Sequence, residues 1–202
     1  MSPRSKEASA RMRAASRAAL LVAARKLFSE QGYFNTKVSD IAREAGMSPG
    51  NVYLYFSGKE ELLQAVLADG FEALERSLQE AAEGPGSGEE KMARLLDTYI
   101  AFERERGDFT RVLMSLFGHG GAPLLQQLGF DLEQIGLGYH QSVLRILAQA
   151  QAEGIGGNVD PNVQTMFFFA FFNGLSITYG QDWLDIPSSV IQNAVMRLMF
   201  PQ

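Results

Sequence analysis

The sequence predicts an all-α protein, with an N-terminal three-helix unit joined by a long helix to a larger helical C-terminal part. Three observations predict this class. Apolar residues recur at helical spacing along most of the chain, helix-starting and helix-ending residues punctuate it, and no convincing β alternation or internal repeat is present. Apolar residues make up 46% of the 202 residues, enough for a sizeable core. We expect a division into residues 1–60 and 61–202.

The first helix is predicted to end at about Gln31, because Gly32 follows as a stop signal. Its buried stripe consists of Leu20, Ala24, Leu27 and Phe28. Residues 1–14 are polar, basic and rich in alanine. They form either a disordered arm or an early extension of this helix.

Residues 36–59 predict two short helices separated by a tight glycine turn. The first has an apolar face with spacing i, i+3, i+4 and i+7, made of Val38, Ile41, Ala42 and Ala45. We expect Thr36 to cap this helix and Gly46 to supply the left-handed residue after it. Ser48 is the expected cap of the second helix, with Pro49 at its first position.

The second short helix is expected to bury Val52 and Phe56 and to leave most of its other side chains facing outward. The outward set contains two tyrosines, a leucine and an amide: Pro49, Gly50, Asn51, Tyr53, Leu54 and Tyr55. This arrangement is typical of a helix-turn-helix, in which the second helix enters a DNA major groove.

The same stretch resembles the N-terminal signature of the TetR family of transcriptional regulators, over roughly residues 15–65. The matching residues are Thr36, Ile41-Ala42, Ala45-Gly46-Met47-Ser48, Gly50, Tyr53, Tyr55-Phe56 and Lys59, followed by Leu62 and Leu63. The family often has histidine where Tyr55 stands. The resemblance implies a DNA-binding head, a C-terminal ligand-binding domain and a homodimer built by the last two long helices.

The resemblance also implies which residues contact DNA. Phosphate contacts are expected from Thr36, Ser48, Tyr53, Tyr55 and Lys59, and these position the protein without reading sequence. Base contacts are expected from Lys37, Pro49, Gly50, Asn51 and Leu54; the Asn51 amide can pair with an adenine edge. Each also has a purely structural interpretation, as a cap, a packed ring, a tolerated glycine or a solvated charge.

A long helix is expected from Ser57 to about Glu83, with Ser57 and Glu60 at capping-box spacing, before residues 84–88 break the chain. Further helices are expected around residues 92–100 and, capped by Asp108, around 112–117. After a break at residues 118–121, helix is expected over 123–153, weakened near Gly129, Gly136 and Gly138. Asp160-Pro161 starts a helix ending near Trp183, and Pro187-Ser188 starts the last, which runs to about Phe200.

Five phenylalanines in residues 167–172 make one helix apolar all round, so it must be covered on every side. We expect a second subunit to cover one side, although a wholly intramolecular core is the alternative. The expected dimer interface is Phe167, Phe171, Trp183, Val190, Ile191, Ala194, Val195 and Leu198.

A ligand cavity is the second implication of the resemblance. Its expected lining is mostly aromatic, with a few polar groups to orient an apolar or aromatic effector: Phe102, Leu113, Leu116, Phe117, Phe130, Tyr139, His140, Phe168, Phe172 and Asn173. Such aromatics can equally be ordinary core residues.

Charge is divided unevenly along the chain. Residues 1–60 hold ten Lys/Arg and five Asp/Glu, a net of +5, whereas residues 61–202 carry a net of −10. The positive half contains the helix-turn-helix, which favours nucleic-acid binding there. Uneven surface charge without function is the alternative interpretation.

The composition also excludes several chemistries. The chain has no cysteine, and its two histidines, His119 and His140, lack a carboxylate cluster at ligand spacing. No apolar run reaches membrane-spanning length and the N-terminus lacks a signal-peptide core, so we expect a cytoplasmic protein without membrane contact.

We predict a ligand-responsive DNA-binding regulator, not an enzyme and without a cofactor or metal. It would act as a homodimer on a palindromic operator, most simply as a repressor released by its effector. The alternative is a helical-bundle carrier or enzyme without a DNA-binding role. Such a protein would have no reason to display Tyr53, Tyr55 and Lys59 beside a basic arm.

Overall fold

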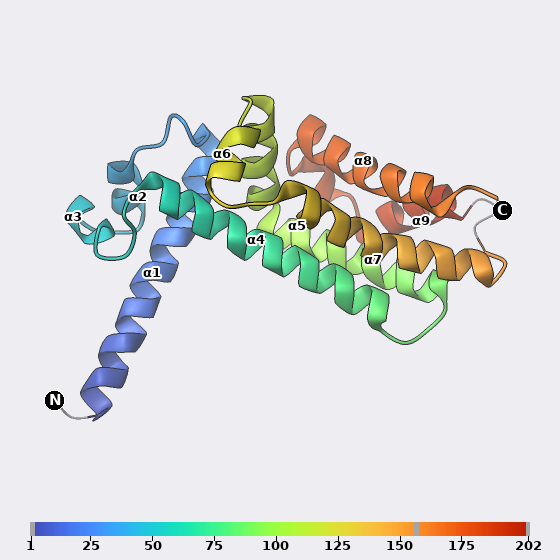
Figure 1. Ribbon diagram of the computed structural model, residues 1–202, viewed down its shortest axis with the longest axis horizontal. Coiled ribbons are helices and arrows are strands. Elements are labelled where there is room, and N and C mark those ends of the chain that lie inside the picture. Colours follow the sequence, from blue (N-terminus) through green and yellow to red (C-terminus); the bar gives the residue numbers. More distant parts are fainter. Residues whose placement is uncertain (1–2, 156–157, 201–202) are drawn as a thin grey trace.

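The computed structural model describes residues 3–155 and 158–200, and every regular element in these ranges is helical, as predicted (Figure 1). The helices are α1 (Pro3–Gln31), α2 (Val38–Glu44), α3 (Pro49–Val52), α4 (Lys59–Glu83), α5 (Gly88–Gly118), α6 (Ala122–Gln127), α7 (Leu132–Ala152), α8 (Pro161–Tyr179), the 3-10 turn η1 (Asp182–Asp185) and α9 (Ser188–Met199). None of the helices within the described ranges is both long and apolar enough to cross a membrane.

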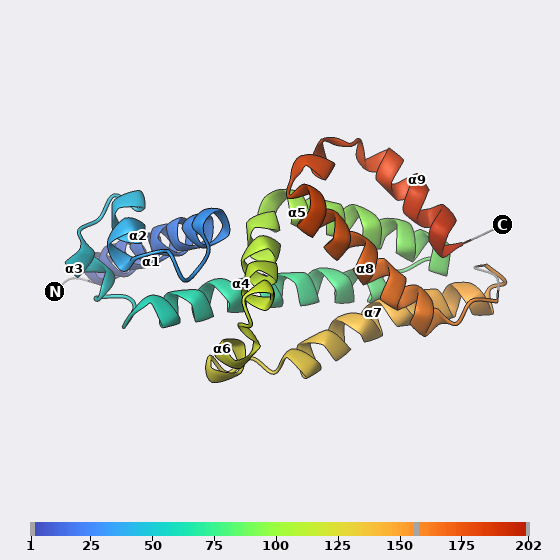
Figure 2. The same ribbon diagram turned by 90° about the horizontal axis from the view of Figure 1, so that it is seen from above.

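The molecule has a small head, α1–α3, at one end of a larger body, α4–α9 (Figures 1 and 2). Helix α4 starts beside α3 and runs into the body, where it lies against α5 and α7. One contiguous core cluster runs through both parts, from Leu20 of α1 to Met199 of α9. The head is therefore packed onto the body as well as tethered to it.

Most predicted helix signals occur where the sequence places them. Gly32, directly after α1, and Gly46, shortly after α2, have φ angles of 79° and 68°. These angles lie in the left-handed region, which favours glycine. The Asp160 side chain accepts from the N–H of Asn162 at the start of α8, with Pro161 at the first position. Residues 3–14, left open between an arm and a helix, are the first turns of α1, and Figure 1 shows them extending beyond the head.

Two of the predicted caps are wrong. Lys37, not Thr36, is the N-cap of α2, and the Thr36 hydroxyl donates to the carbonyls of Gly32 and Leu27. The capping box at Ser57 and Glu60 does not form. Helix α4 starts at Lys59, and the Ser57 N–H donates to the carboxylate of Glu61 instead. The cap form predicted there occurs at α5, where Ser87 and Glu90 bond reciprocally.

The predicted helix breaks of the body are partly confirmed. The two helices expected around residues 92–100 and 112–117 are joined in α5 across a kink at Arg106, whose φ of −137° and ψ of 17° are not helical (Figure 2). Asp108 lies two residues after this kink, where its carboxylate pairs with Arg25 and also accepts from the N–H of Phe109. The stretch expected over 123–153 is divided into α6 and α7 at Gly129, whereas Gly136 and Gly138 lie inside α7. Trp183 lies in η1, beyond the end of α8 at Tyr179.

Candidate nucleic-acid interface

Helices α2 and α3 form the predicted helix-turn-helix, held by a few buried side chains. Ile41 and Ala42 of α2 and Val52 of α3 are buried, as is Phe56 in the turn that follows. The guanidinium of Arg17 on α1 lies over the Phe56 ring, 4.9 Å from its centre. Because α3 has only four residues, its orientation depends on these contacts with α1 and α2.

The outer side of α3 and its following turn is exposed. Pro49, Gly50, Asn51, Tyr53 and Leu54 are all exposed, and Tyr55 is half-buried. The side chain of Ser48, the N-cap of α3, makes no capping hydrogen bond, so its hydroxyl is open to an outside partner. An exposed aromatic and amide surface on a short, well-anchored helix fits the depth of a DNA major groove.

Lys59 lies at the start of α4, beside the loop that follows α1. Its ammonium donates to the carbonyls of Tyr33, at 2.9 Å, and Phe34, at 3.3 Å, and lies 4.4 Å from the Tyr33 ring centre. These contacts hold the charge in place at the edge of the head and leave one N–H direction without a protein acceptor. Burial, with help from Glu60, raises the pKa of Tyr33 to about 12, so that phenol stays neutral and donates to Glu60.

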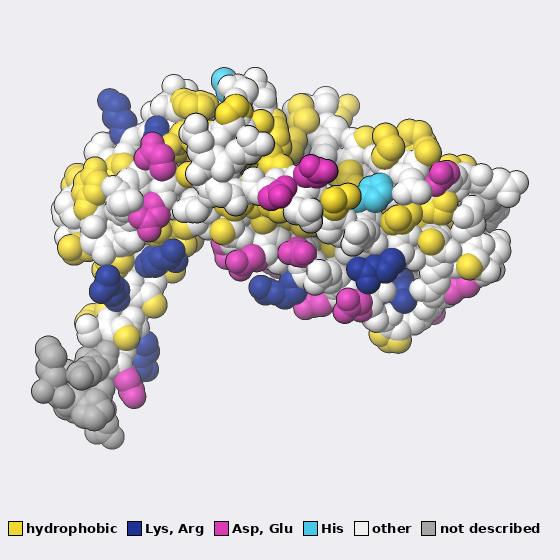
Figure 3. Space-filling model, in the orientation of Figure 1, with side chains coloured by type: hydrophobic (Ala, Val, Ile, Leu, Met, Phe, Trp, Pro, Cys, Tyr) yellow, Lys and Arg dark blue, Asp and Glu magenta, His cyan; other side chains and the backbone are white. Residues whose placement is uncertain are grey.

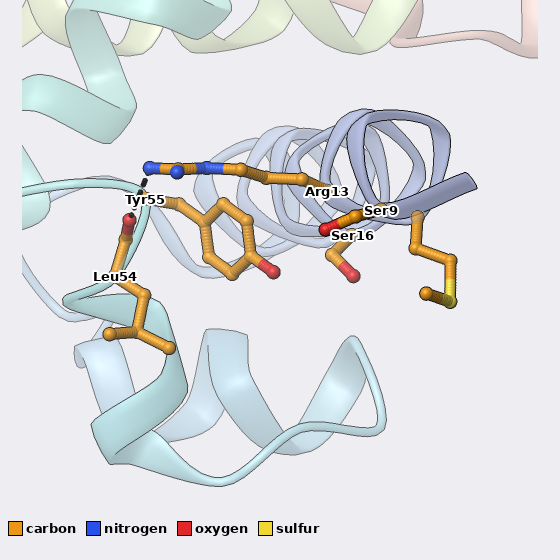
Figure 4. Close-up of a pocket in the computed structure, with 6 residues that line it drawn as sticks. Ser9, Arg13, Ser16, Leu54 and Tyr55 are labelled. Atoms are coloured by element: carbon orange, nitrogen blue, oxygen red, sulfur yellow. Dashed lines mark hydrogen bonds between the residues drawn. The ribbon is translucent and has the colours of Figure 1, made fainter. Parts of the chain in front are cut away.

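A groove of about 340 Å³ separates α1 from the turn after α3 (Figure 4). Arg13 spans it and donates to the Leu54 carbonyl at 3.4 Å, and its guanidinium lies 5.9 Å from the centre of the Tyr55 ring. The hydroxyls of Ser9 and Ser16 lie on the α1 side. The groove thus joins a cation to several hydroxyl groups, a combination suited to the phosphodiester backbone.

The charge division found in the sequence is visible in space. Figure 3 shows basic side chains spaced along α1 and acidic side chains spread over the body. Sequence reasoning omitted Arg17 from the interface, although Arg13 and Arg17 stand at i, i+4 and so share a face of α1.

Not every predicted contact residue lies on this surface. Lys37, Ser48, Asn51 and Tyr53 are exposed, but Thr36 is only 1% exposed and its hydroxyl is occupied by carbonyls of α1. A phosphate contact through the Thr36 hydroxyl was therefore the wrong assignment, since that group is the donor that closes the end of α1.

Residues 20–66 match the sequence profile of the family described as "Bacterial regulatory proteins, tetR family". This match covers α2, α3 and their supports in α1 and α4. The helix-turn-helix unit of this chain is therefore similar to the DNA-binding unit of that family. The chain is 35% identical over 91 residues to the HTH-type transcriptional regulator HbdR of Aromatoleum sp. (strain CIB). That alignment spans 45% of this chain and 40% of HbdR, well under two thirds of the relative.

Solved structures of TetR-family regulators share the fold over most of the chain. The ketosteroid transcriptional regulator KstR2 of Mycobacterium tuberculosis is 18% identical, with a TM-score of 0.77, covering 92% of this chain and 95% of its own. AibR in complex with isovaleryl coenzyme A and operator DNA is 19% identical, with a TM-score of 0.73, covering 92% and 98%. At these identities the likeness establishes the fold.

The residues predicted to line a TetR-type ligand cavity are dispersed. Phe102, Leu116, Phe168 and Phe172 are buried, and the last two pack with Tyr99 in an aromatic cluster. None of these four lines the hollows at the end of α5 and at α6. Of the rest, Leu113, Tyr139 and Asn173 are half-buried, and the Tyr139 hydroxyl donates to the Phe71 carbonyl. His140 lies 3.4 Å from the Asn162 amide oxygen. Phe117 borders a hollow at the end of α5, and Phe130 borders another at α6.

The predicted dimer residues divide into two sets. Trp183, Ile191 and Val195 are buried within the protomer, so assigning them to an interface was wrong; they pack the last two elements onto α5 and α8. Phe171 is half-buried. Phe167, Val190, Ala194 and Leu198 are exposed, and Figure 3 shows hydrophobic side chains on the surface over α8.

Proposed function

We propose that this protein is a ligand-responsive transcriptional regulator that binds operator DNA as a homodimer and most simply acts as a repressor. The observation that carries the proposal is the head surface. An anchored short helix exposes Asn51 and Tyr53, and the Lys59 ammonium is fixed beside it. The match of residues 20–66 to the TetR-family profile supports the same conclusion.

The proposed DNA contacts divide into two kinds. Ser48, Tyr53, Tyr55 and Lys59 would hold phosphates, and the α1 groove with Arg13 would add another backbone contact. Lys37, Pro49, Gly50, Asn51 and Leu54 would face the bases, where Asn51 can pair with adenine and the apolar groups can meet a thymine methyl. The negative body would repel the duplex and orient its approach.

The homodimer is proposed from an apolar stripe on α8. Val163, Met166, Phe167 and Ala170 are exposed and follow helical spacing, with Phe167 60% exposed. On α9, Val190, Ala194 and Leu198 are exposed at successive turns. Two long helices with adjoining exposed apolar stripes fit a four-helix interface between two copies, related by a two-fold axis. The two heads would then reach half-sites about 34–36 Å apart, or a multiple of it.

The effector is proposed to be an apolar or aromatic small molecule bound by the body. AibR has been captured with both isovaleryl coenzyme A and operator DNA, which supports an effector for this chain as well. A ligand can change operator affinity only through its different affinities for the two head arrangements, and coupling of about 1–3 kcal/mol changes affinity roughly 5–150-fold.

The test is selection of a duplex from genomic DNA, followed by affinity measurements across salt concentrations. Neutralising roughly six to ten phosphates per dimer should lower affinity steeply between low and moderate salt. Lys59→Ala should weaken binding to specific and non-specific duplexes alike. Asn51→Ala should cost about 1–3 kcal/mol on the selected duplex and little on others.

Lys91→Ala, the same charge change at the start of α5 in the body, is the matched control for Lys59→Ala and should leave DNA binding unchanged. Thermal unfolding of each variant separates a lost contact from a damaged head, because Lys59 also bonds the loop after α1. Failure to select any duplex, or binding that ignores salt, contradicts the proposed function.

A further inference from the structure

A hollow of about 520 Å³ lies where the head meets the body, between the end of α1, the second half of α5 and the end of α8. Ser29 lines it from α1, Arg111, Met114, Ser115 and Phe117 from α5, and Ile177 from α8. Its volume falls within the range of about 300–1,000 Å³ that small-molecule sites occupy. It shares Phe117 with the lining expected from the sequence, but Phe102, Leu116, Phe168 and Phe172 do not line it.

Arg111 is the feature of this hollow that calls for a ligand. It is half-buried, yet within the described part of the chain its guanidinium makes no hydrogen bond and no ion pair. By contrast, Arg25 is paired with Asp108, and Arg106 with Asp69. Arg111 interacts electrostatically with the carboxyl group of Glu103, but Glu103 is itself buried and already accepts a hydrogen bond from Thr110. A guanidinium has five N–H donors and strongly favours a bidentate anion when partly removed from water.

The rest of the lining is mixed in a way that limits the ligand. Ser115 contributes a hydroxyl without a hydrogen-bond partner among the described residues. Ser29 contributes a hydroxyl that donates a hydrogen bond to the Lys26 carbonyl. Met114, Phe117 and Ile177 form an apolar wall, and Phe117 and Ile177 are exposed in this structure, so a ligand that covered them would remove apolar surface from water. One cation, hydroxyls and an apolar wall fit an anionic head with an apolar tail.

We infer that this hollow is an effector site for an amphiphilic organic anion, a carboxylate with an apolar tail held by Arg111. The inference rests on the proposed function in that it assigns a place and a chemical class to the effector. The carboxylate would receive two N–H bonds from Arg111 and one O–H bond from Ser115, and the tail would lie along Met114, Phe117 and Ile177.

The position of the hollow supplies a route to the DNA. Ser29 stands two residues before the end of α1, so a molecule in the hollow touches the head and the body at once. Two contacts of the same α5 segment also hold the head: the Arg25–Asp108 ion pair, and the His119 ring beside the Phe34 ring, with centres 6.4 Å apart. A bound anion would favour one setting of α1 against α5 and so change the spacing of the two heads of a dimer.

The experiment is calorimetric titration of the full chain with octanoate, and with octan-1-ol as the neutral molecule of the same tail. Octanoate should bind the parent protein and Arg111→Lys, which keeps the cation. Arg111→Met should bind at least about tenfold more weakly, as expected for loss of a charge-assisted pair. Arg76→Met, the same change at an exposed arginine of α4 outside the hollow, should bind like the parent. Octan-1-ol should bind weakly and equally to all four proteins.

Three results would overturn the inference: no octanoate binding by the parent protein at about 1 mM, equal affinities of the parent and Arg111→Met, or equal affinities for octanoate and octan-1-ol. Circular dichroism of Arg111→Met confirms that weaker binding is not unfolding. Operator affinity is measured separately, without octanoate. If DNA binds and octanoate does not, only this site assignment fails; if octanoate binds through Arg111 and no duplex is ever selected, the proposed function fails and the site stands.

Discussion

The head is joined to the body in two places, and the two joints differ in kind. The first is α4, a continuous helix that runs from Lys59 beside α3 into the body and crosses α5 at Gly70. The second is the far half of α5, which meets α1 through the Arg25–Asp108 ion pair, while His119 just after α5 contacts Phe34 in the loop after α1. The first joint is covalent and tightly packed, whereas the second is a non-covalent helix contact that includes an ion pair and a ring contact and can therefore separate.

This difference indicates how the head can be controlled. A stiff helix transmits a rotation of the body to the head, whereas a separable contact selects between two head positions. An effector that acts on the second joint needs to supply only the small free energy by which those contacts stabilise one position of the head. The proposed anion site lies at this second joint, which is why its occupancy would be felt by the head.

The packed joint should be the more costly to disturb. A Cβ at Gly70 would overlap the ring of Phe109, which packs edge-on against Phe71 and Phe102 just after the bend of α5. Gly70→Ala should therefore lower the free energy of unfolding by about 1–3 kcal/mol through overpacking, less up to about 1 kcal/mol gained from helix propensity. Urea denaturation gives the difference.

Gly136→Ala is the matched control, because Gly136 also lies inside a helix, α7, but faces open space. It should raise stability by up to about 1 kcal/mol. Phe109→Leu should relieve part of the cost when combined with Gly70→Ala, so the two changes should not add. If both glycine variants changed stability alike, α4 and α5 would not be tightly packed at this crossing.

The two joints also differ in how far the sequence predicted them. The periodicity and stop signals of α4, such as Leu63, Val66 and Gly84, are local, and they placed its end correctly at Glu83. The second joint depends on partners far apart in sequence: Arg25 and Asp108 are 83 positions apart, so a pattern of neighbours gave Asp108 the role of a cap. The bend at Arg106 did have a local signal, since Asp108, two residues further on, predicted the start of a second helix.

The candidate site divides in the same way. The outward set around Asn51 and Tyr53 follows from one turn of helix and a dense motif, so it was predicted correctly as exposed. Thr36 was misplaced because a hydroxyl before a helix can donate backward to the preceding helix as well as cap the next one. Burial of Trp183, Ile191 and Val195 depends on which of several apolar faces meets the rest of the body. Arg111 did leave a signal, a single cation within the apolar run from Phe109 to Phe117.

The separable joint should contribute less to stability than the packed one. The Arg25–Asp108 pair joins Nε to Oδ2 at 2.8 Å, and the two side chains are 22% and 21% exposed. We expect a coupling free energy of about 1 kcal/mol, near the top of the range for exposed pairs because this one is partly shielded from water. A double-mutant cycle with Arg25→Met and Asp108→Asn measures it.

Lys26–Glu44, a pair within the head whose side chains are 50% and 37% exposed, is the control and should couple by less than about 0.5 kcal/mol. Breaking Arg25–Asp108 should also change operator affinity, because it frees α1 from α5, whereas breaking the control pair should not. Equal coupling in both pairs, together with unchanged operator affinity, would remove the joint from the mechanism.

The smallest expected effect concerns the bend of α5 itself. Glu103 lies before the bend and accepts a hydrogen bond, at 2.8 Å, from the hydroxyl of Thr110 after it. Burial raises the pKa of Glu103 above its usual 4.5, while bonds with Thr110 and Ser176 and the charge of Arg111 oppose that rise. A carboxyl with a raised folded-state pKa binds its proton more tightly when folded, so its contribution to stability is present below about pH 4.5 and is lost as pH rises through the folded pKa.

Glu103→Gln cannot ionise and should escape this loss. The stability of the parent protein minus that of Glu103→Gln, from urea denaturation at several pH values between about 4 and 8, should therefore fall as pH rises. A difference that is constant or grows with pH would mean that the bend does not hold Glu103 in a buried, proton-favouring environment.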